Sequence, residues 1–188
     1  RDIWMIRTIF TNVFLLWKIF YSIIRMKKEN QKKCKMIKIV ITDVDGVLTD
    51  GSMYYTKNGD YMRRFNTKDG MGVELLKNKN IKTIFLSREK SPIVKKRAEK
   101  LKVAKSYLGI KDKVLILPRI CKEFDVKPSE IAYIGDDVND LEIMKKIGFS
   151  ACPKDSVIQI RKIVNYICSS NGGHGAFREL ADNIISSK

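Results

Sequence analysis

The sequence contains a single histidine, His174, among its 188 residues, and only four cysteines. One histidine rules out a metal site built from several imidazoles. The cysteines lie far apart and form no Cys-x-x-Cys pair, which argues against a zinc site and against a disulfide framework. This usage is typical of the reducing cytoplasm, where we expect the protein to act. The four cysteines are Cys34, Cys121, Cys152 and Cys168.

No motif for binding RNA or DNA is found, although the chain carries 37 Lys and Arg against 21 Asp and Glu, a formal net charge of +16. The lysines are dispersed along the chain and are not interleaved with aromatic residues, so their pattern does not indicate a nucleic-acid partner. A Lys-rich composition and an anionic substrate explain the excess of positive charge better.

An uninterrupted apolar run long enough for a bilayer, about 20 residues, is also missing. Residues 1–25 are strongly apolar, but Arg7 and Lys18 interrupt them and Arg25 ends them. They suit a membrane-surface helix, a signal anchor or an extension upstream of the true start. Contact with a membrane is therefore expected only if these residues belong to the mature protein.

The next segment, residues 26–35, is polar and basic. Because Met26 and Met36 each precede a sensible start, we favour the upstream extension. The sequence thus predicts an extension and linker outside the fold over 1–35, followed by one folded domain over 36–188.

The stretch that organises this domain is an apolar, β-branched run that ends in Asp43 and Asp45, followed by Gly46. It predicts a buried parallel strand that opens into a loop, with both carboxylates at the carboxyl end, where ligands bind in open α/β sheets. One acid can serve as a nucleophile while the other gives and takes a proton. Taken alone, however, two such acids are better explained as turn-capping residues.

Three later positions strengthen the functional interpretation. Ser87 ends the second predicted core strand, and its hydroxyl can hold a phosphoryl oxygen. Lys113, near the start of a helix predicted over 111–124 with Leu115 facing inward, can neutralise phosphoryl charge, although a lone lysine is more often solvated surface. The run from Gly135 to Asp140 places three acids where a strand meets a helix. Helix capping explains one of them, whereas magnesium favours such an oxygen-rich set. The three acids are Asp136, Asp137 and Asp140.

Together these positions resemble the complete motif set of the haloacid dehalogenase superfamily of phosphatases. The resemblance implies that Asp43 attacks phosphorus to form an aspartyl-phosphate, and that Asp45 protonates the leaving alcohol and then activates water. Ser87 and Lys113 would bind the phosphoryl group. The cofactor implied is Mg²⁺. Its implied ligands are Asp43, Asp136 and the backbone carbonyl of Asp45, with Asp137 and Asp140 orienting the atoms around the metal.

The alternation of strand-like and helical segments predicts an α/β fold with a doubly wound, mostly parallel, Rossmann-like sheet, and the motif resemblance implies that it is of haloacid dehalogenase type. Asn58-Gly59 between two aromatic-rich runs predicts a β-hairpin that projects from the loop after Asp43. The apolar residues of this hairpin suggest that it packs against another copy of the chain. The gap between Asp43 and Ser87 leaves no room for a large cap domain.

The glycine-rich segment from Gly172 to Glu179 leads into a C-terminal helix. It resembles the mobile tail that closes a neighbouring subunit's active site in the capless 3-deoxy-D-manno-octulosonate 8-phosphate phosphatase family, and the resemblance extends over roughly 36–185. It implies a homotetramer that acts on a sugar acid phosphate. From the glycines alone, a loop before a surface helix is equally well supported.

Two classes of sugar acid phosphate are compatible with the resemblance. Octulosonate 8-phosphate enzymes usually carry Thr-Gly-Arg where this chain has Ser87-Arg88-Glu89, and the segment around Glu89 looks like that of the 2-keto-3-deoxynononate or N-acylneuraminate 9-phosphate enzymes. We therefore place a nine-carbon substrate first and octulosonate 8-phosphate second. Arg88 departs from the glycine that is usual in both groups.

Several side chains are candidates for recognition of the sugar acid. Glu89 can accept hydrogen bonds from sugar hydroxyls or pair with Lys100, while Arg97 or Lys68 can bind the substrate carboxylate. A noncatalytic function is the alternative of a different class, because similar domains occur as oligomerisation modules of sialic-acid activating enzymes. Those modules tend to lose motif residues, and here all the motifs are intact.

Overall fold

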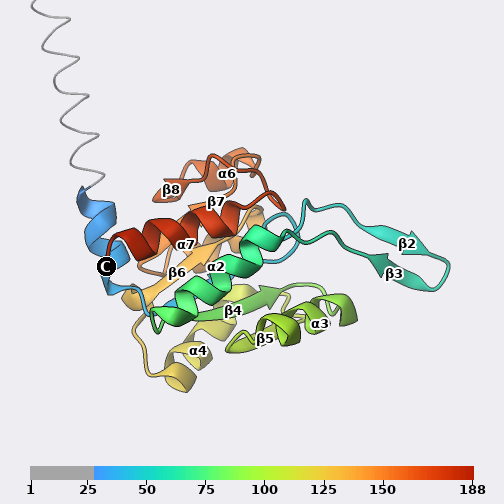
Figure 1. Cartoon of the computed structure of the whole chain (residues 1–188), viewed down its shortest axis with the longest axis horizontal. Helices are drawn as coiled ribbons and strands as arrows, with labels where there is room; N and C mark the ends of the chain where they lie inside the picture. The colour runs from blue at the N-terminus through green and yellow to red at the C-terminus, as the bar shows by residue number, and fades with distance from the viewer. Residues whose placement is uncertain (1–27) are drawn as a thin grey trace, which may run out of the picture.

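The computed structural model describes residues 28–188 (Figure 1). Residues 28–36 are helical, and within them Cys34 is fully buried and joins the apolar core. Asn30 donates a hydrogen bond of 2.8 Å to the backbone oxygen of Asn165. The predicted linker is therefore a packed helix from residue 28 onward, because Cys34 supplies an apolar contact. The prediction for residues 1–27 lies outside the described part of the chain.

A six-stranded parallel sheet forms the centre of the domain, in the order β5-β4-β1-β6-β7-β8. The chain winds outward from β1 first through β4 and β5, and then through β6, β7 and β8. This confirms the predicted doubly wound sheet, and its order reverses at β1, where such folds bind ligands. The strands are β1 Ile39–Thr42, β4 Lys82–Ser87, β5 Lys105–Leu108, β6 Ile131–Ile134, β7 Phe149–Cys152 and β8 Tyr166–Ile167.

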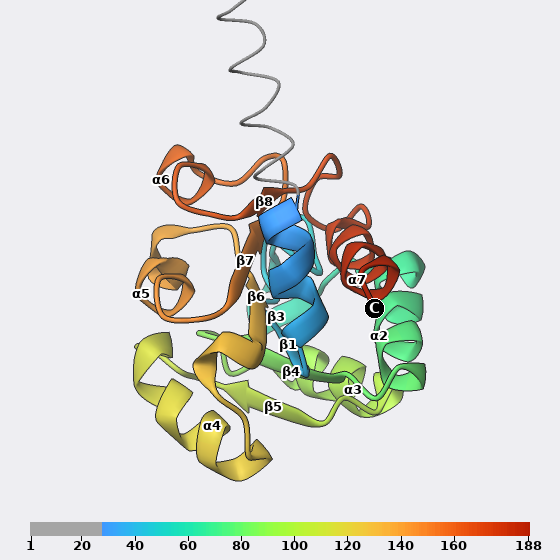
Figure 2. The same cartoon turned by 90° about the vertical axis from the view of Figure 1, so that its left-hand side faces the viewer.

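Helices cover both faces of the sheet (Figure 2). Val40 of β1 faces the core beneath α2, α3 and α7, whereas Ile39 and Ile41 face the core beneath α4, α5 and α6. Both faces of β1 are buried, which explains its continuous apolar run. The helices are α2 Thr67–Asn78, α3 Pro92–Leu101, α4 Leu117–Phe124, α5 Leu141–Met144, α6 Ile158–Arg161 and α7 Ala176–Ser186, with 3₁₀ turns η1 Lys113–Ile116, η2 Pro128–Glu130 and η3 Val138–Asp140.

The predicted hairpin is present as the antiparallel pair β2 (Tyr54–Thr56) and β3 (Gly59–Met62), and it projects away from the sheet (Figure 1). Gly59 has a φ of +104°, which only glycine adopts readily, so the turn forms where the sequence predicts it. Tyr55 and Tyr61 are largely exposed. Within residues 28–188, nothing larger than this hairpin is inserted between β1 and α2.

The helix predicted over 111–124 is divided in two. Lys113–Ile116 form the 3₁₀ turn η1, and α4 begins at Leu117 with Pro118 in its first turn. Proline is tolerated in the first turn because a backbone N–H there would have no partner within the helix. It cannot continue a preceding helix, which explains why the predicted helix is divided. The inward prediction for Leu115 is wrong, since 73% of this residue is exposed.

The C-terminal segment packs on its own domain. Helix α7 lies along α2 (Figure 1), and its Phe177, Leu180 and Ile184 are fully buried. Glu179 accepts hydrogen bonds from the Tyr166 hydroxyl and from nearby serines. Helix α7 is thus part of the apolar core of its own domain. Closure of a neighbouring site by this segment stays a prediction.

Asp69, in the first turn of α2, joins this helix to α7. It is buried, and its Oδ1 accepts a hydrogen bond of 2.9 Å from the backbone N–H of Arg178. Its Oδ2 has no hydrogen-bond partner among the described residues. Burial raises the pKa of Asp69 to about 6, although the hydrogen bond from the Arg178 backbone opposes the shift.

This pKa predicts a pH-dependent contribution to stability. The folded state favours the protonated acid, so Asp69 costs stability as the pH rises from about 4, near its unfolded pKa, through about 6. Asp69→Asn keeps an oxygen acceptor for Arg178 and removes the charge. We expect the variant to be more stable than wild type by about 2–3 kcal/mol at pH 7 and equally stable near pH 4. Urea unfolding at several pH values measures this difference, and a constant difference would contradict the explanation.

Candidate active site

The carboxyl ends of β1, β4 and β6 meet at one edge of the sheet, where a cavity of about 160 Å³ opens. Asp43 follows β1 directly, Ser87 ends β4, and Asp136 lies two residues beyond β6. Gly46 allows the loop after β1 to approach Asp136, since it has a φ of +86° and a Cβ there would lie 2.0 Å from Asp136 Oδ2. The cavity is lined by Asp43, Asp45, Ser87, Glu89, Asp136 and Asp137.

Lys113 lies beneath the cavity, fully buried. Its Nζ is 2.9 Å from Asp43 Oδ1 and 2.6 Å from Asp140 Oδ1. Burial lowers the pKa of Lys113, but Asp43 and Asp140 more than offset this, so its pKa is raised and the ammonium stays charged. The alternative of a solvated surface lysine is therefore wrong.

Oxygen atoms of Asp43, Asp136 and Asp140 lie within 4.8 Å of one another. Both oxygens of Asp140 are engaged in hydrogen bonds: its Oδ1 accepts hydrogen bonds of 2.6 Å from Lys113 and from the Tyr133 hydroxyl, and its Oδ2 accepts one from the Asp136 backbone. Asp140 therefore holds the site together. Buried oxygens without a hydrogen-bond partner in the described residues remain on Asp136 and on Asn139.

The charges of this cluster suit a divalent cation. Burial, with the neighbouring charge of Asp140, raises the pKa of Asp43 to about 7. Burial together with the charges of Asp43 and Asp140 raises the pKa of Asp136 to about 8. Three carboxylates against the single ammonium of Lys113 leave negative charge unbalanced in a buried place. Magnesium, which prefers carboxylate oxygens, would balance it, and Asp43 and Asp136 carry the oxygens for it.

The side chain of Asp45 is directed to a partner that the sequence did not reveal. Its Oδ1 is 2.9 Å from Nε of Arg63, and the Arg63 side chain is 1% exposed. Burial raises the pKa of Asp45, and the positive charge of Arg63 opposes the shift. No sequence signal distinguishes Arg63 from the adjacent Arg64, whose side chain is 54% exposed.

Ser87 and its two successors lie at the cavity. Ser87 is buried, and its Oγ accepts a hydrogen bond of 3.0 Å from the backbone N–H of Glu89, which leaves its hydroxyl hydrogen free to bind a ligand. Arg88 and Glu89 both line the cavity and are exposed. Asp137 is exposed as well, and caps η3 by accepting a hydrogen bond from the backbone of Val138.

The three remaining recognition candidates do not line this cavity. Arg97 donates to the backbone oxygen of Asn66, and its guanidinium lies over the ring of Phe65. Lys68 and Lys100 are exposed on α2 and α3. The predicted pair between Glu89 and Lys100 is not among the ion pairs of residues 28–188.

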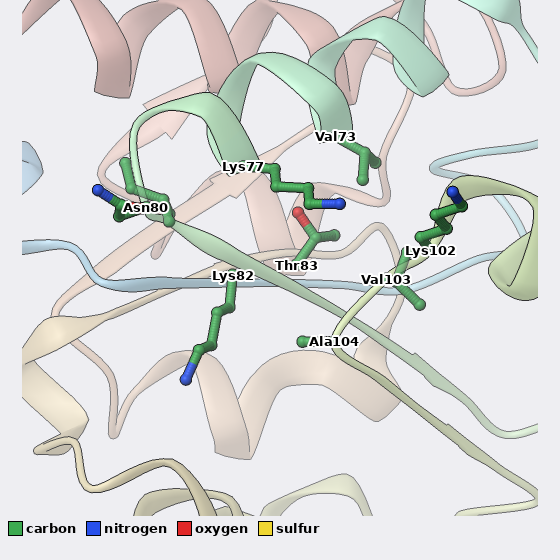
Figure 3. Close-up of a pocket in the computed structure, with 9 residues that line it drawn as sticks. Val73, Lys77, Asn80, Lys82, Thr83, Lys102, Val103 and Ala104 are labelled. Carbon is green, nitrogen blue, oxygen red and sulfur yellow. The ribbon is translucent and has the colours of Figure 1, made fainter.

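A larger cavity, of about 350 Å³, lies near the opposite end of β4 (Figure 3). Lys77 and Lys102 border it, and Thr83 points into it from β4. Its lining contains no carboxylate, cysteine or histidine, so it offers neither a metal site nor an acid. The chemistry therefore belongs to the smaller cavity.

Comparisons with known proteins agree with this placement. A family model described as haloacid dehalogenase-like hydrolase matches residues 109–180. The 3-deoxy-D-manno-octulosonate 8-phosphate phosphatase of Haemophilus influenzae is 38% identical over 158 residues, 84% of this chain and 88% of that protein. The enzyme of the same name from Salmonella typhi is 31% identical and covers 81% of each chain. The chain belongs to this phosphatase family.

Solved structures of the family share the fold. The Moraxella catarrhalis phosphatase, in complex with magnesium, phosphate and a KDO molecule, has a TM-score of 0.82 and 33% identity, covering 85% of this chain and 92% of that one. The cobalt-bound Haemophilus influenzae phosphatase has a TM-score of 0.81 and 38% identity, and the match covers 82% of this chain and 91% of that one. The chain is thus a phosphatase of haloacid dehalogenase type, and its cofactor is Mg²⁺.

The charge balance predicts how magnesium affects stability. We expect Mg²⁺ at a hundredfold excess over its Kd to stabilise wild type by about 2.7 kcal/mol. Asp136→Asn should be more stable than wild type without metal, because it relieves repulsion from Asp43, and should lose most of the response to Mg²⁺. Asp137→Asn is the matched control and should keep the response. Thermal unfolding with Mg²⁺ or chelator measures both effects, and an unchanged response in Asp136→Asn would exclude Asp136 as a ligand.

Proposed function

We propose that the protein is a magnesium-dependent phosphomonoesterase that removes the terminal phosphate of 3-deoxy-D-manno-octulosonate 8-phosphate. The observation that carries the proposal is identity of 31–38% to enzymes of that name over more than four-fifths of the chain. This evidence favours the eight-carbon substrate over the nine-carbon substrate that Glu89 suggested. The intact carboxylate cluster beside Lys113 argues against the noncatalytic module.

In the first half of the proposed reaction, a carboxylate oxygen of Asp43 forms a bond to phosphorus as the bond between phosphorus and the alcohol oxygen breaks. Asp45 gives its proton to that alcohol oxygen. Lys113, 2.9 Å from Asp43, favours the ionised form of the attacking carboxylate, and the Ser87 hydroxyl donates to a phosphoryl oxygen. Magnesium held by Asp43 and Asp136 would supply positive charge to neutralise the phosphoryl group.

In the second half, water attacks the phosphorus of the aspartyl-phosphate, the bond to Asp43 breaks, and Asp45 takes the proton from water. Asp140, itself held by the Tyr133 hydroxyl, fixes Lys113 throughout. The cavity of about 160 Å³ suits a phosphate group and leaves the sugar acid in the open mouth beside Glu89. We infer that another subunit covers this mouth.

Replacement of the nucleophile tests the mechanism. Asp43→Asn should lower turnover of octulosonate 8-phosphate by about a thousandfold or more, because the amide cannot form the acyl-phosphate. Glu142→Gln, at an exposed carboxylate that pairs with Lys145, is the control and should retain activity. Phosphate release with Mg²⁺ and with chelator is the measurement. Retained activity in folded Asp43→Asn would exclude this nucleophile.

The same assay decides the substrate when octulosonate 8-phosphate, 2-keto-3-deoxynononate 9-phosphate and N-acetylneuraminate 9-phosphate are compared in parallel. We expect the highest kcat/KM for the octulosonate ester. A preference for either nine-carbon ester would reverse the proposed specificity and identify Glu89 as its candidate determinant.

We further propose a homotetramer, located in the cytoplasm. The exposed aromatic residues of the hairpin support assembly, and the four free cysteines fit a reducing compartment. Arg97, Lys68 and Lys100, which do not reach their own cavity, are candidates to act at a neighbouring subunit's site. The C-terminal segment is a candidate for the same role.

The hairpin can be tested directly. Tyr55→Lys with Tyr61→Lys should reduce the molar mass in solution and raise KM, because the introduced charges resist burial between subunits. Leu115→Lys, at an exposed apolar residue outside the hairpin, should change neither. Light scattering after size-exclusion chromatography is the measurement, and an unchanged mass in the hairpin variant would contradict assembly through this element.

A further inference from the structure

We propose that Arg63 is the positioning residue for the proton donor Asp45, and that it ties this acid to the root of the β-hairpin and to the start of α3. The inference rests on the proposed function, in which Asp45 protonates the leaving alcohol. It adds a component that the motif set does not include, located outside the strands that carry the motifs.

The position of Arg63 is unusual for a hairpin residue. It directly follows β3, the second strand of the hairpin. The aromatic residues of the hairpin are exposed, yet the side chain of Arg63 is only 1% exposed. Nε lies 2.9 Å from Asp45 Oδ1 and Nη1 lies 2.8 Å from Asp60 Oδ2. The guanidinium thus bridges two carboxylates in a buried place, where charges are retained only when they are paired.

The bridge continues to a third element. Asp60 Oδ2 also accepts a hydrogen bond of 2.7 Å from Oγ of Ser91, the buried residue that precedes α3. Ser91 occupies the N-cap position of α3, but its side chain makes no capping bond to that helix. A connected set of side chains therefore runs from Asp45 through Arg63 and Asp60 to Ser91.

Asp45 depends on this set for its orientation. In the part of the chain that the structure describes, Arg63 is the only group that forms an ion pair with the Asp45 carboxylate, and no side-chain hydrogen bond holds it. The Nε and Oδ1 atoms are at ion-pair distance but are not aligned as a hydrogen bond. Without Arg63 the carboxyl group would be free to rotate away from the leaving oxygen.

A positioning role and a purely structural role differ in how their effects depend on the leaving group. A sugar phosphate is an alkyl ester whose alkoxide is a poor leaving group, so breaking its bond to phosphorus needs the proton from Asp45. p-Nitrophenyl phosphate releases a stable phenolate and needs little help. Since kcat/KM includes only the steps up to release of the leaving group, it isolates this proton transfer. Loss of the proton donor's position should therefore affect the alkyl ester selectively.

The experiment compares Arg63→Met, Arg63→Lys and Arg64→Met, measured as kcat/KM for both esters in the full chain with Mg²⁺. The alkyl ester is whichever sugar acid phosphate the enzyme hydrolyses best. Arg63→Met should lose about a hundredfold on the alkyl ester and less than about threefold on p-nitrophenyl phosphate. Arg63→Lys should recover part of the loss, since lysine restores the positive charge but not the planar guanidinium that contacts two carboxylates. Arg64→Met, the exposed neighbour, should behave as wild type on both.

Asp45→Asn, alone and combined with Arg63→Met, separates the two hypotheses. If Asp45→Asn lowers kcat/KM equally for both esters, the assignment of Asp45 as proton donor is wrong. If Asp45→Asn is selective for the alkyl ester and Arg63→Met is not, the inference about Arg63 is wrong. We expect Arg63→Met to add little in the Asp45→Asn background, because both remove the same function.

A milder pair of variants covers the case in which Arg63→Met fails to fold. Ser91→Ala and Asp60→Asn leave the arginine in place and weaken the contacts that hold it. Each should produce the same selectivity for the alkyl ester, with a loss of about threefold to tenfold. Equal loss on both esters, or none on either, would overturn the positioning role.

Discussion

The ammonium of Lys113, buried between Asp43 and Asp140, is the interaction on which the arrangement of this site depends. It lies 2.9 Å from the first carboxylate and 2.6 Å from the second. Three acids gather at this edge of the sheet, and without a cation between them their mutual repulsion and loss of hydration would drive them to take up protons. Burial already raises the pKa values of Asp43 and Asp136. The lysine supplies part of the balancing charge, and a magnesium ion held by Asp43 and Asp136 would supply the rest.

This balance explains why the site is assembled from separate parts of the chain. Asp43 comes from β1 and Lys113 from η1, while Asp140 follows β6 and is held by the hydroxyl of Tyr133 within that strand. Asp140 uses both its oxygens in hydrogen bonds, so it acts as the fixed support for Lys113. The parallel sheet is what makes this possible, because it delivers the carboxyl ends of its central strands to one edge.

A second group of charges lies on the hairpin side of the cavity. Asp45 faces Arg63, which also holds Asp60 beside Ser91. One acid of the Asp-x-Asp pair is thus fixed by the buried lysine and the other by the root of the hairpin. The two acids are only two residues apart, yet they have different partners, which fits the different tasks proposed for them. The element expected to mediate assembly is also the one that holds the proton donor.

Prediction from the sequence succeeded where local pattern and sheet geometry agree. The apolar run before Asp43 and the glycine-led acids after β6 identified two strand ends, and parallel strands bring such ends together. It was less successful where the outcome depends on packing. Leu115 has the spacing of an inward helical residue, but the chain restarts its helix at Leu117 and leaves Leu115 exposed. The segment from residue 28 reads as polar, yet it packs on the domain as a helix, through the buried Cys34 and a hydrogen bond from Asn30 to Asn165.

The sequence by itself determined the fold class, the hairpin and the acids of the site, because strand periodicity, turn residues and the order of motifs are local properties of the chain. Only the tertiary structure decided which side chains became partners. Arg63 and Arg64 are adjacent and chemically identical, and one is buried against Asp45 while the other is exposed. Likewise Lys113 is one of many lysines, and only its burial between two carboxylates sets it apart. Burial and pairing are properties of the packed chain, and they arise between residues that the sequence places far apart.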